Sequence, residues 1–558
     1  MKTCKKLYHL SRAVVIISMF VVVLVGCSGS GGGAGAGAPS SSFVSGVAAA
    51  GAPIIGNAYL KDSANHVIGP VPIGADGSFL FDVTGLTPPF YLRVDGYVGS
   101  PSNSYSLFSV TTSSSGIANI NPLTNAIVAA AAGGIDPASV YGDPVAHPVT
   151  QANLDKAITD LQTILEAILT ANNAQNLNPI SSPFVANNTQ LDKVFDQITV
   201  VVTTSGGTTT VTITNSFTGA VIVQVATESL GTTPPVTDTT IPLVNNIIIG
   251  ANNLLLNQQA GGGYYWPSVT TDTDLTQHPN TITVTAQGVE NAYILNQSNT
   301  YLTSLLKTYN LLLSNSEASV NTKVNGYTIA NIRGADIYFL VNLSNTTGDQ
   351  TYANLAKTWY KTTLTNFYGG TATGLATAIL NSYANTGSTS GTTSILSAWD
   401  LNMPVRGLLA LNSFFPNQGF DSDAEAITEV IFNSLYGPSA VVDPSTSQAD
   451  YYLGITGAIE AFSATGLHLD KRDALLSVLL ASQLSNGSFP TVQDQNPVQT
   501  TAYAVMALIK ANAVPAAKSG VVFLVKRQLP SGMWIEDDGN EYAEIDSEAI
   551  QAIYNFQK

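Results

Sequence analysis

Apolar residues recur at two different spacings along the chain, and the change of spacing separates a strand-rich part from a helix-rich part. Short apolar runs bounded by Gly, Pro and Asp occur at residues 54–60, 78–83, 90–94 and 105–111. Runs of this length between turn residues predict the strands of a small β-sandwich, which we place at residues 44–115.

Residues 116–230 mix the two spacings. Within residues 152–171 the apolar positions fall on one face of a helix. These positions are Leu154, Ile158, Leu161, Ile164, Leu165, Ile168 and Leu169. Residues 194–225 return to Val, Thr and Ile runs, with residues 205–207 (SGG) as a hairpin turn. We therefore expect a mixed helix and β-hairpin region, ended by a Thr/Pro-rich linker at residues 231–241.

The remaining residues, 242–558, have helical spacing and contain an internal repeat. Its motif is a glutamine, a glycine four positions later and an aromatic residue two positions after that. The motif occurs as Gln259/Gly263/Tyr265, Gln483/Gly487/Phe489 and Gln528/Gly532/Trp534. The last two copies lie 45 residues apart, and the helices that follow them, residues 501–508 and 546–553, match at the same offset. Such a period predicts helix pairs that bury their apolar faces against their neighbours.

These copies resemble the Gln-Trp motifs of the α/α-toroid superfamily, which includes squalene-hopene cyclases, protein prenyltransferases and the thioester domain of complement-type proteins. The resemblance implies an all-α toroid of five or six helical hairpins, with an inner ring of helices around a central funnel. An open helical solenoid is the alternative. Residues 75–79 (ADGSF) and 83–86 (VTGL) resemble a segment of carboxypeptidase-regulatory-like or transthyretin-like β modules, which implies a spacer or binding module.

The chain begins with an export signal. Four basic residues, Lys2, Lys5, Lys6 and Arg12, precede an apolar run at residues 13–25 that is too short for a comfortable membrane span. An ordinary signal peptide or an uncleaved anchor are alternatives.

The segment LVGC at residues 24–27 resembles the lipobox of bacterial lipoproteins. It implies a signal peptide at residues 1–26 and a lipidated Cys27 carrying several acyl chains. A flexible Gly/Ser/Ala linker follows at residues 27–43. The non-acidic Ser28 implies sorting to the outer membrane of the cell envelope.

Charge and cysteine content exclude several functions. Without the leader, 17 basic and 37 acidic residues leave a net charge of −20, and no basic patch typical of a nucleic-acid binder is visible. The leader contains Cys4, and Cys27 is the predicted lipidation site, so no cysteine remains for a disulfide, a zinc site or a nucleophile. His147, His278 and His468 have no metal-binding spacing. We expect no metal and no cofactor.

Five aspartates are candidate catalytic acids. Asp421 and Asp423 are the nearest match to the acid motif of class II terpenoid cyclases, but the adjacent acid and the threonine are missing, and a helix cap is the alternative for Asp421. Asp400, Asp450 and Asp546 stand near the starts of predicted inner helices, where toroid enzymes acting on polysaccharides use carboxylates. For these three, stabilisation of helix starts is the alternative.

Aromatic residues are the candidate ligand contacts. Tyr264, Tyr265 and Trp266 follow a glycine run, and Trp399 lies beside Asp400. They suit stacking on a sugar ring or an isoprenoid, or a place in the core.

The predicted function is a lipid-anchored envelope protein that displays a toroid as a ligand-binding or interaction domain for a glycan, an isoprenoid or a protein. A polysaccharide lyase or hydrolase is the first alternative. A terpenoid cyclase is the second.

Overall fold

A computed structural model describes residues 41–99, 104–187, 189–236, 242–264, 279–315, 321–324, 327–330, 334–384, 395–437, 448–489, 497–537 and 539–558. The predicted signal peptide, Cys27 and the linker up to residue 40 lie outside the described residues. Among the residues described, no helix has the length and apolar character needed to cross a membrane.

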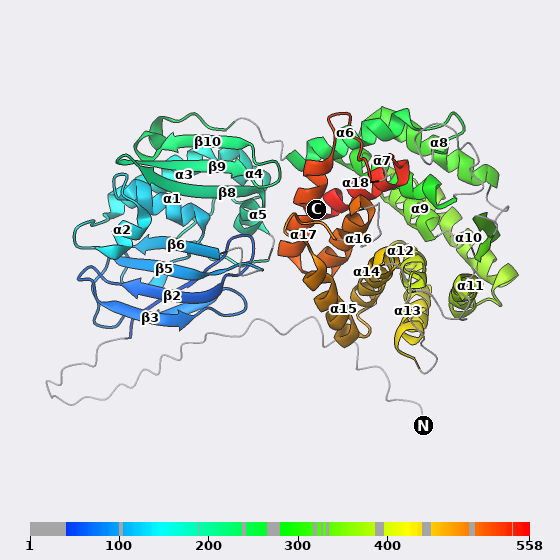
Figure 1. Cartoon of the computed structure of the whole chain (residues 1–558), viewed down its shortest axis with the longest axis horizontal. Coiled ribbons are helices and arrows are strands. Elements are labelled where there is room, and N and C mark those ends of the chain that lie inside the picture. Colours follow the sequence, from blue (N-terminus) through cyan, green and yellow to red (C-terminus); the bar gives the residue numbers. More distant parts are fainter. Residues whose placement is uncertain are drawn as a thin grey trace, which may run out of the picture. The chain divides into compact units, whose positions relative to one another are not determined.

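Two sheets form the strand-rich part, and Figure 1 labels the strands of the larger one, β2, β3, β5 and β6. The first has the order β4-β1-β7, and the second the order β3-β2-β5-β6. Their bounds are β1 Phe43–Val47, β2 Ile55–Lys61, β3 Val67–Pro72, β4 Ser78–Asp82, β5 Phe90–Tyr97, β6 Ser104–Thr111 and β7 Gly116–Ile117. Alternate side chains of both sheets, such as Val44, Phe81 and Leu92, share one buried core. The predicted sandwich is confirmed, although β1, β3 and β7 were not predicted.

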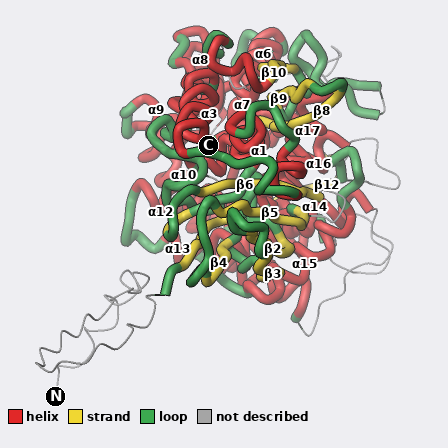
Figure 2. Tube along the Cα trace, turned by 90° about the vertical axis from the view of Figure 1, so that its left-hand side faces the viewer, coloured by secondary structure: helices red, strands yellow, loops and turns green. Residues whose placement is uncertain are grey.

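A second layered unit follows. Its helices are α1 Pro122–Ala131, α2 Pro137–Gly142, α3 Gln151–Ile164, α4 Glu166–Ala171 and α5 Gln190–Gln197, and η1 Thr227–Thr232 is a 3₁₀ helix. Figure 2 shows its sheet, whose order is β10-β9-β8, with bounds β8 Ile198–Ser205, β9 Thr208–Asn215 and β10 Val221–Ala226. The predicted hairpin turn is confirmed, since Gly206 and Gly207 both have positive φ.

The amphipathic helix predicted at residues 152–171 is also confirmed, with all seven predicted apolar residues buried. It is divided at Leu165 into α3 and α4. The prediction that strands start at Val194 is wrong, because Val194 lies in α5 and turns its side chain into the core. Strand β8 begins only at Ile198.

The helix-rich part is a closed ring (Figure 1). Its inner helices are α7 Pro279–Asn296, α9 Gly334–Thr347, α12 Ser397–Phe414, α14 Gln448–Thr465, α16 Pro497–Lys510 and α18 Ala543–Gln557. Each packs against the next, and α18 packs against α7. The Ser547 hydroxyl accepts a 2.9 Å hydrogen bond from the amide of Gly288 at this closing contact. The predicted α/α toroid is therefore confirmed over the open solenoid.

Six outer helices cover the ring in the described residues. They are α6 Pro242–Leu256, α8 Asn299–Asn315, α10 Thr351–Phe367, α13 Phe420–Tyr436, α15 Leu469–Ser482 and α17 Val514–Arg527. Helix α11 Ala372–Ala384 and the hairpin of β11 Asn321–Val324 and β12 Tyr327–Ala330 are insertions. Each outer helix precedes an inner one, which gives six hairpins.

The repeated glutamine ties consecutive outer helices together. Gln483, at the end of α15, donates through Nε2 to the carbonyls of Gly487 at 3.0 Å and Ala516 in α17 at 2.9 Å. Gln528, at the end of α17, donates to Gly532 at 2.9 Å and to Asn246 in α6 at 3.0 Å. The second contact joins the last outer helix to the first and supports closure of the ring.

The first copy of the motif has a different register from the one predicted. Gln258, and not Gln259, donates to the carbonyls of Gly262 at 3.4 Å and of Ser304 in α8 at 3.0 Å. Gly262 has φ +99°, like Gly487 at +92° and Gly532 at +101°. The motif is therefore Gln258, Gly262 and Tyr264, and the assignment to Gln259, Gly263 and Tyr265 is wrong by one residue.

Candidate functional site

The two ends of the ring differ in the length of their connections. Inner helices pass to the next outer helix through short segments, such as residues 297–298 between α7 and α8 and residues 466–468 between α14 and α15. Outer helices reach the next inner helix through long segments, such as residues 257–278 and 483–496. Long connections commonly carry binding and catalytic residues on a rigid scaffold. The ends where the inner helices begin are therefore the favoured location for a site.

Contacts between inner helices that are not neighbours identify the side chains at the centre of the ring. Trp399 on α12 meets Tyr503 on α16 edge to face, with 5.3 Å between ring centroids. Helix α14 stands between these two helices in the order of the ring. Tyr554 on α18 likewise interacts with Tyr338 on α9, past α7. These side chains reach across the centre.

Glu548 on α18 is one acid of this centre. Its Oε1 accepts a 2.6 Å hydrogen bond from the Tyr503 hydroxyl, and its Oε2 accepts one of 3.1 Å from Gln499 Nε2. Burial raises the pKa of Glu548 well above its ordinary value and the nearby Glu544 adds to the rise, while the two hydrogen bonds oppose it. Glu548 therefore keeps its proton to higher pH than an exposed glutamate.

Glu460 on α14 is a second acid, in a different environment. Its Oε2 accepts a 3.1 Å hydrogen bond from Asn402 Nδ2, and it is the main opposite charge facing Arg406. The Arg406 guanidinium also lies over the Tyr338 ring, 4.8 Å from its centroid. Burial lowers the pKa of Arg406, but Glu460 and the facing tyrosines raise it, and the net pKa lies above its ordinary value.

Glu290 on α7 is a further buried acid of the ring. It is almost fully buried, and it shares a hydrogen bond with Asn342 on α9 and interacts with Tyr554 on α18. Burial raises the pKa of Glu290 well above its ordinary value, and the bond with Asn342 opposes this only in part. All six inner helices thus contribute polar or aromatic side chains to the centre. Arg406 balances the charge of one acid, Glu460.

Of the three aspartates predicted near the starts of inner helices, Asp546 makes its described contacts outside this group. Asp546 is fully buried, and its Oδ1 accepts a 2.8 Å hydrogen bond from the amide of Trp534, the aromatic residue of the third motif. One repeat earlier, the Thr501 hydroxyl accepts the equivalent hydrogen bond from the amide of Phe489. Asp546 is therefore a structural residue of the repeat. Asp400 is half-buried in the first turn of α12, and the side chain of Asp450 lies outside what the structure describes.

The two aspartates of the cyclase-like segment lie on an outer helix. Asp421 is exposed in the first turn of α13, and Asp423 accepts a 2.9 Å hydrogen bond from Tyr360 of α10. Asp421 is not the N-cap of α13, which is Gly419, but its Oδ1 accepts a 2.9 Å hydrogen bond from the amide of Ser422 in the first turn. Since α13 is outside the ring, neither aspartate reaches the centre.

Among the predicted aromatic contacts that the structure describes, Trp399 reaches the centre and Tyr264 does not. Tyr264 is buried in the motif, where its hydroxyl lies 3.4 Å from Ser304 Oγ. Tyr265 and Trp266 lie outside the described residues. The residues that sequence reasoning missed are Glu290, Asn402, Arg406, Glu460, Gln499, Tyr503 and Glu548. The sequence feature that could have identified them is a polar residue within an otherwise apolar helix, in a chain with only 10% charged residues.

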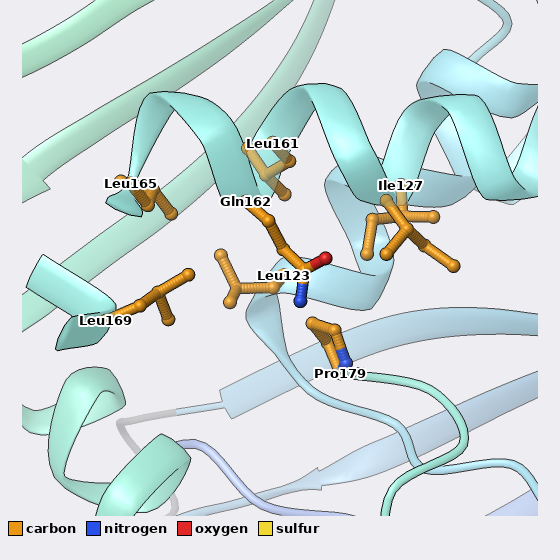
Figure 3. A pocket seen from close by; sticks show the side chains of 8 residues that line it. Leu123, Ile127, Leu161, Gln162, Leu165, Leu169 and Pro179 are labelled. Atoms are coloured by element: carbon orange, nitrogen blue, oxygen red, sulfur yellow. The ribbon is translucent and has the colours of Figure 1, made fainter. Parts of the chain in front are cut away.

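A separate depression lies in the strand-rich half of the chain, between α1, α3 and α4 (Figure 3). It is lined mainly by aliphatic side chains, among them Leu123, Leu161 and Leu169. Gln162 is its one side chain with hydrogen-bonding atoms, and its Nε2 is bound to the carbonyl of Leu177 at 2.8 Å. This depression offers no group for chemistry. Among the described residues, no group of three or more His, Cys, Asp or Glu side chains is placed to hold a metal ion.

Of the comparisons with known proteins, only the one with solved structures found similar proteins. No family model and no curated protein matches the chain. The GH76A α-1,6-mannanase from Salegentibacter sp. HEL1_6 is 11% identical, with a TM-score of 0.40, over 56% of this chain and 98% of its own. The cellobiose 2-epimerase from Spirochaeta thermophila DSM 6192 is 14% identical, with a TM-score of 0.39, over 57% and 99%.

The type II terpene cyclase MstE from Scytonema is 14% identical, with a TM-score of 0.35, over 56% of this chain and 97% of its own. At TM-scores below 0.5 these likenesses carry no argument about activity. The function has to be argued from the residues of the ring.

Proposed function

We propose that the ring binds an oligosaccharide at its centre and hydrolyses a glycosidic bond, with Glu548 as the proton donor and Glu460 as the second carboxyl group. One observation carries this proposal. Two glutamates from different inner helices lie at the polar centre of the ring, each held by its own hydrogen-bonding partners. Most glycoside hydrolases use a pair of carboxyl groups that lie in different environments.

The polarity of the centre supports a sugar over a hydrocarbon. Burying carboxyl groups and a guanidinium costs stability relative to apolar residues of similar size, so their presence in a core favours a functional role. Hydroxyl groups of a sugar match amide, carboxyl and phenol partners such as those of Gln499, Glu460 and Tyr503. An isoprenoid would instead suit an apolar aromatic lining, and the cyclase-like Asp421 and Asp423 are on an outer helix.

The two acids suit different steps. Glu548 has a raised pKa and so holds a proton that it can transfer to the leaving oxygen of the glycosidic bond. Glu460 lies beside the Arg406 guanidinium and takes the role of the second carboxyl group. It would activate a water molecule or stabilise the positive charge that develops on the sugar ring.

The predicted anchor is part of the proposal. Acyl chains on Cys27 would hold the protein at the envelope, at roughly 0.8 kcal/mol for each buried CH₂ group. The residues between Cys27 and β1 would act as a tether. The replacement Cys27→Ser should move the protein from the membrane fraction to the soluble fraction; unchanged membrane association would contradict lipidation.

The test of hydrolysis is release of reducing ends from a panel of oligosaccharides of different linkage. The native protein should release them, and Glu548→Gln and Glu460→Gln should each lower the rate at least about 100-fold, by loss of acid or base catalysis. Asp421→Asn, an exposed change on α13, is the matched control and should keep full activity. Activity that survives both glutamate replacements would contradict the assignment.

Glycan binding without cleavage is the second candidate. It is favoured by the complete burial of Glu548 and by the occupation of both its oxygens by Tyr503 and Gln499. Under this alternative, native mass spectra would show the protein with an intact bound oligosaccharide and no products over time.

A further inference from the structure

We infer that Trp399 and Asn402 on α12 form a subsite that selects an acetamido group, so that the glycan of this ring is an N-acetylated sugar. The inference rests on the function proposed above and names the substrate class of the same site. It starts from two polar atoms, Trp399 Nε1 and Asn402 Oδ1, which are buried and have no hydrogen-bond partner.

The orientation of the Asn402 amide is fixed by its neighbour. Its Nδ2 donates to Glu460 Oε2 at 3.1 Å, and a carboxylate oxygen in this position accepts the bond. The other amide atom, Oδ1, is therefore an acceptor. With the residue only 3% exposed, this acceptor lies out of reach of bulk solvent. Leaving such an atom unpaired is unfavourable, so a bound partner is expected to occupy it.

Trp399 supplies the complementary atom. Its indole nitrogen can only donate, and the ring stands at the centre of the toroid against Tyr503. Residues three apart on a helix share a face, with about 5–6 Å between their Cβ atoms. A buried donor and a buried acceptor are thus presented side by side by one helix.

A secondary amide matches this pair. Its carbonyl accepts from Trp399 Nε1, its N–H donates to Asn402 Oδ1, and its methyl group needs apolar surroundings. Met403, which is half-buried on the same face of α12, and the Trp399 ring supply apolar surface. A plain hydroxyl group would leave that apolar surface unused. The acetamido group at C2 of an amino sugar therefore fits the subsite better than the hydroxyl of an ordinary hexose.

The test compares two β-1,4-linked tetrasaccharides that differ at C2, tetra-N-acetylchitotetraose and cellotetraose, by calorimetric titration of the full-length protein. We expect the N-acetylated sugar to bind at least tenfold more tightly. Trp399→Phe keeps an aromatic ring and removes the donor, and it should abolish the preference for the N-acetylated sugar. Trp359→Phe, on outer helix α10, is the matched control and should keep the preference.

A second measurement does not depend on the affinity of the variant. The chain has four tryptophans, so the indole N–H of Trp399 can be assigned in an ¹⁵N spectrum by its loss in Trp399→Phe. The N-acetylated sugar should shift this signal downfield, as expected for a new hydrogen bond. Equal affinity for both sugars with an unmoved signal would overturn this inference and leave the proposed glycan site intact. Binding of neither sugar, nor of any member of the linkage panel, would overturn the proposed function itself.

Discussion

The Tyr503 hydroxyl donates a 2.6 Å hydrogen bond to Glu548 Oε1, and the two residues occupy the same position in successive 45-residue repeat units. One repeat therefore places a phenol where the next places a carboxyl group, and the ring brings the two together. Burial raises the pKa of both groups, and their hydrogen bond opposes the rise for Glu548. The pair links the repeat to the chemistry proposed for the centre.

Removal of the Tyr503 hydroxyl should shift the pH dependence of hydrolysis. In Tyr503→Phe, Glu548 loses a donor that stabilises its charged form, so its pKa should rise further. Because the protonated acid is the active form, the alkaline limb of the rate profile should move to higher pH. The measurement is the rate of reducing-end release across pH 4–10. A limb that stays in place would contradict the role of Glu548 as proton donor.

Replacement of Glu290 should change how stability depends on pH. Its folded-state pKa is raised by burial, so the folded protein holds this proton more tightly than the unfolded chain. The resulting stability is fully present below the unfolded pKa of about 4.3 and is lost as pH rises through the folded pKa. The Glu290→Gln variant has no ionisable carboxyl group at this position, so it does not lose this stability as pH rises.

The melting temperature of Glu290→Gln should therefore increase relative to that of the native protein as pH rises from 4 to 8. Asp546 and Glu548 also have raised pKa values, but they titrate in both proteins and cancel in the difference. A constant difference in melting temperature over this range would show that Glu290 carries no such shift.

The register of the first motif can be tested by two neighbouring replacements. Gln258→Ala removes bonds to the carbonyls of Gly262 and Ser304 and should lower the free energy of unfolding by about 1–3 kcal/mol. Gln259→Ala removes a side chain whose Nε2 makes no hydrogen bond, and it should change stability by less than about 0.5 kcal/mol. Urea unfolding of both variants distinguishes the two registers, since the reverse order would restore the original assignment.

The glycine of the motif should tolerate no side chain. Gly487 has φ +92°, and a Cβ there would lie 2.0 Å from the carbonyl oxygen of Ser519. Gly466 has φ +74° but open space around it. Gly466→Ala therefore measures backbone strain alone, about 1 kcal/mol, whereas Gly487→Ala adds the steric clash and should cost about 3 kcal/mol or more. Equal losses in thermal melts would show that close packing is unimportant at the motif.

Much of the fold could be predicted from local patterns. The 45-residue period identified the hairpins from α15 to α18, because the glutamine, glycine and aromatic residues of each copy make their contacts at fixed offsets. The first copy was misplaced because Gln258 and Gln259 form a doublet, as do Tyr264 and Tyr265. With three glycines between them, two registers fit the pattern equally well, and packing against α8 selects one.

The site was harder to predict than the fold. Inner helices are buried on the face toward the outer ring and on the face toward the centre, so apolar spacing does not show which face points inward. Glu460 and Glu548 lie on different inner helices, and nothing in their local sequence indicates that both side chains point into the interior of the ring. Asp546 was selected for its position at a helix start, a place where acids commonly stabilise structure.

The most direct test of the proposed site is a crystal structure of the Glu548→Gln variant with tetra-N-acetylchitotetraose. We expect an intact sugar at the centre of the ring, in contact with Trp399 on α12 and beside residue 548 on α18. A sugar bound on the outer helices, or a centre that holds only ordered water at saturating sugar, would contradict the claim that the centre of the ring is the functional site.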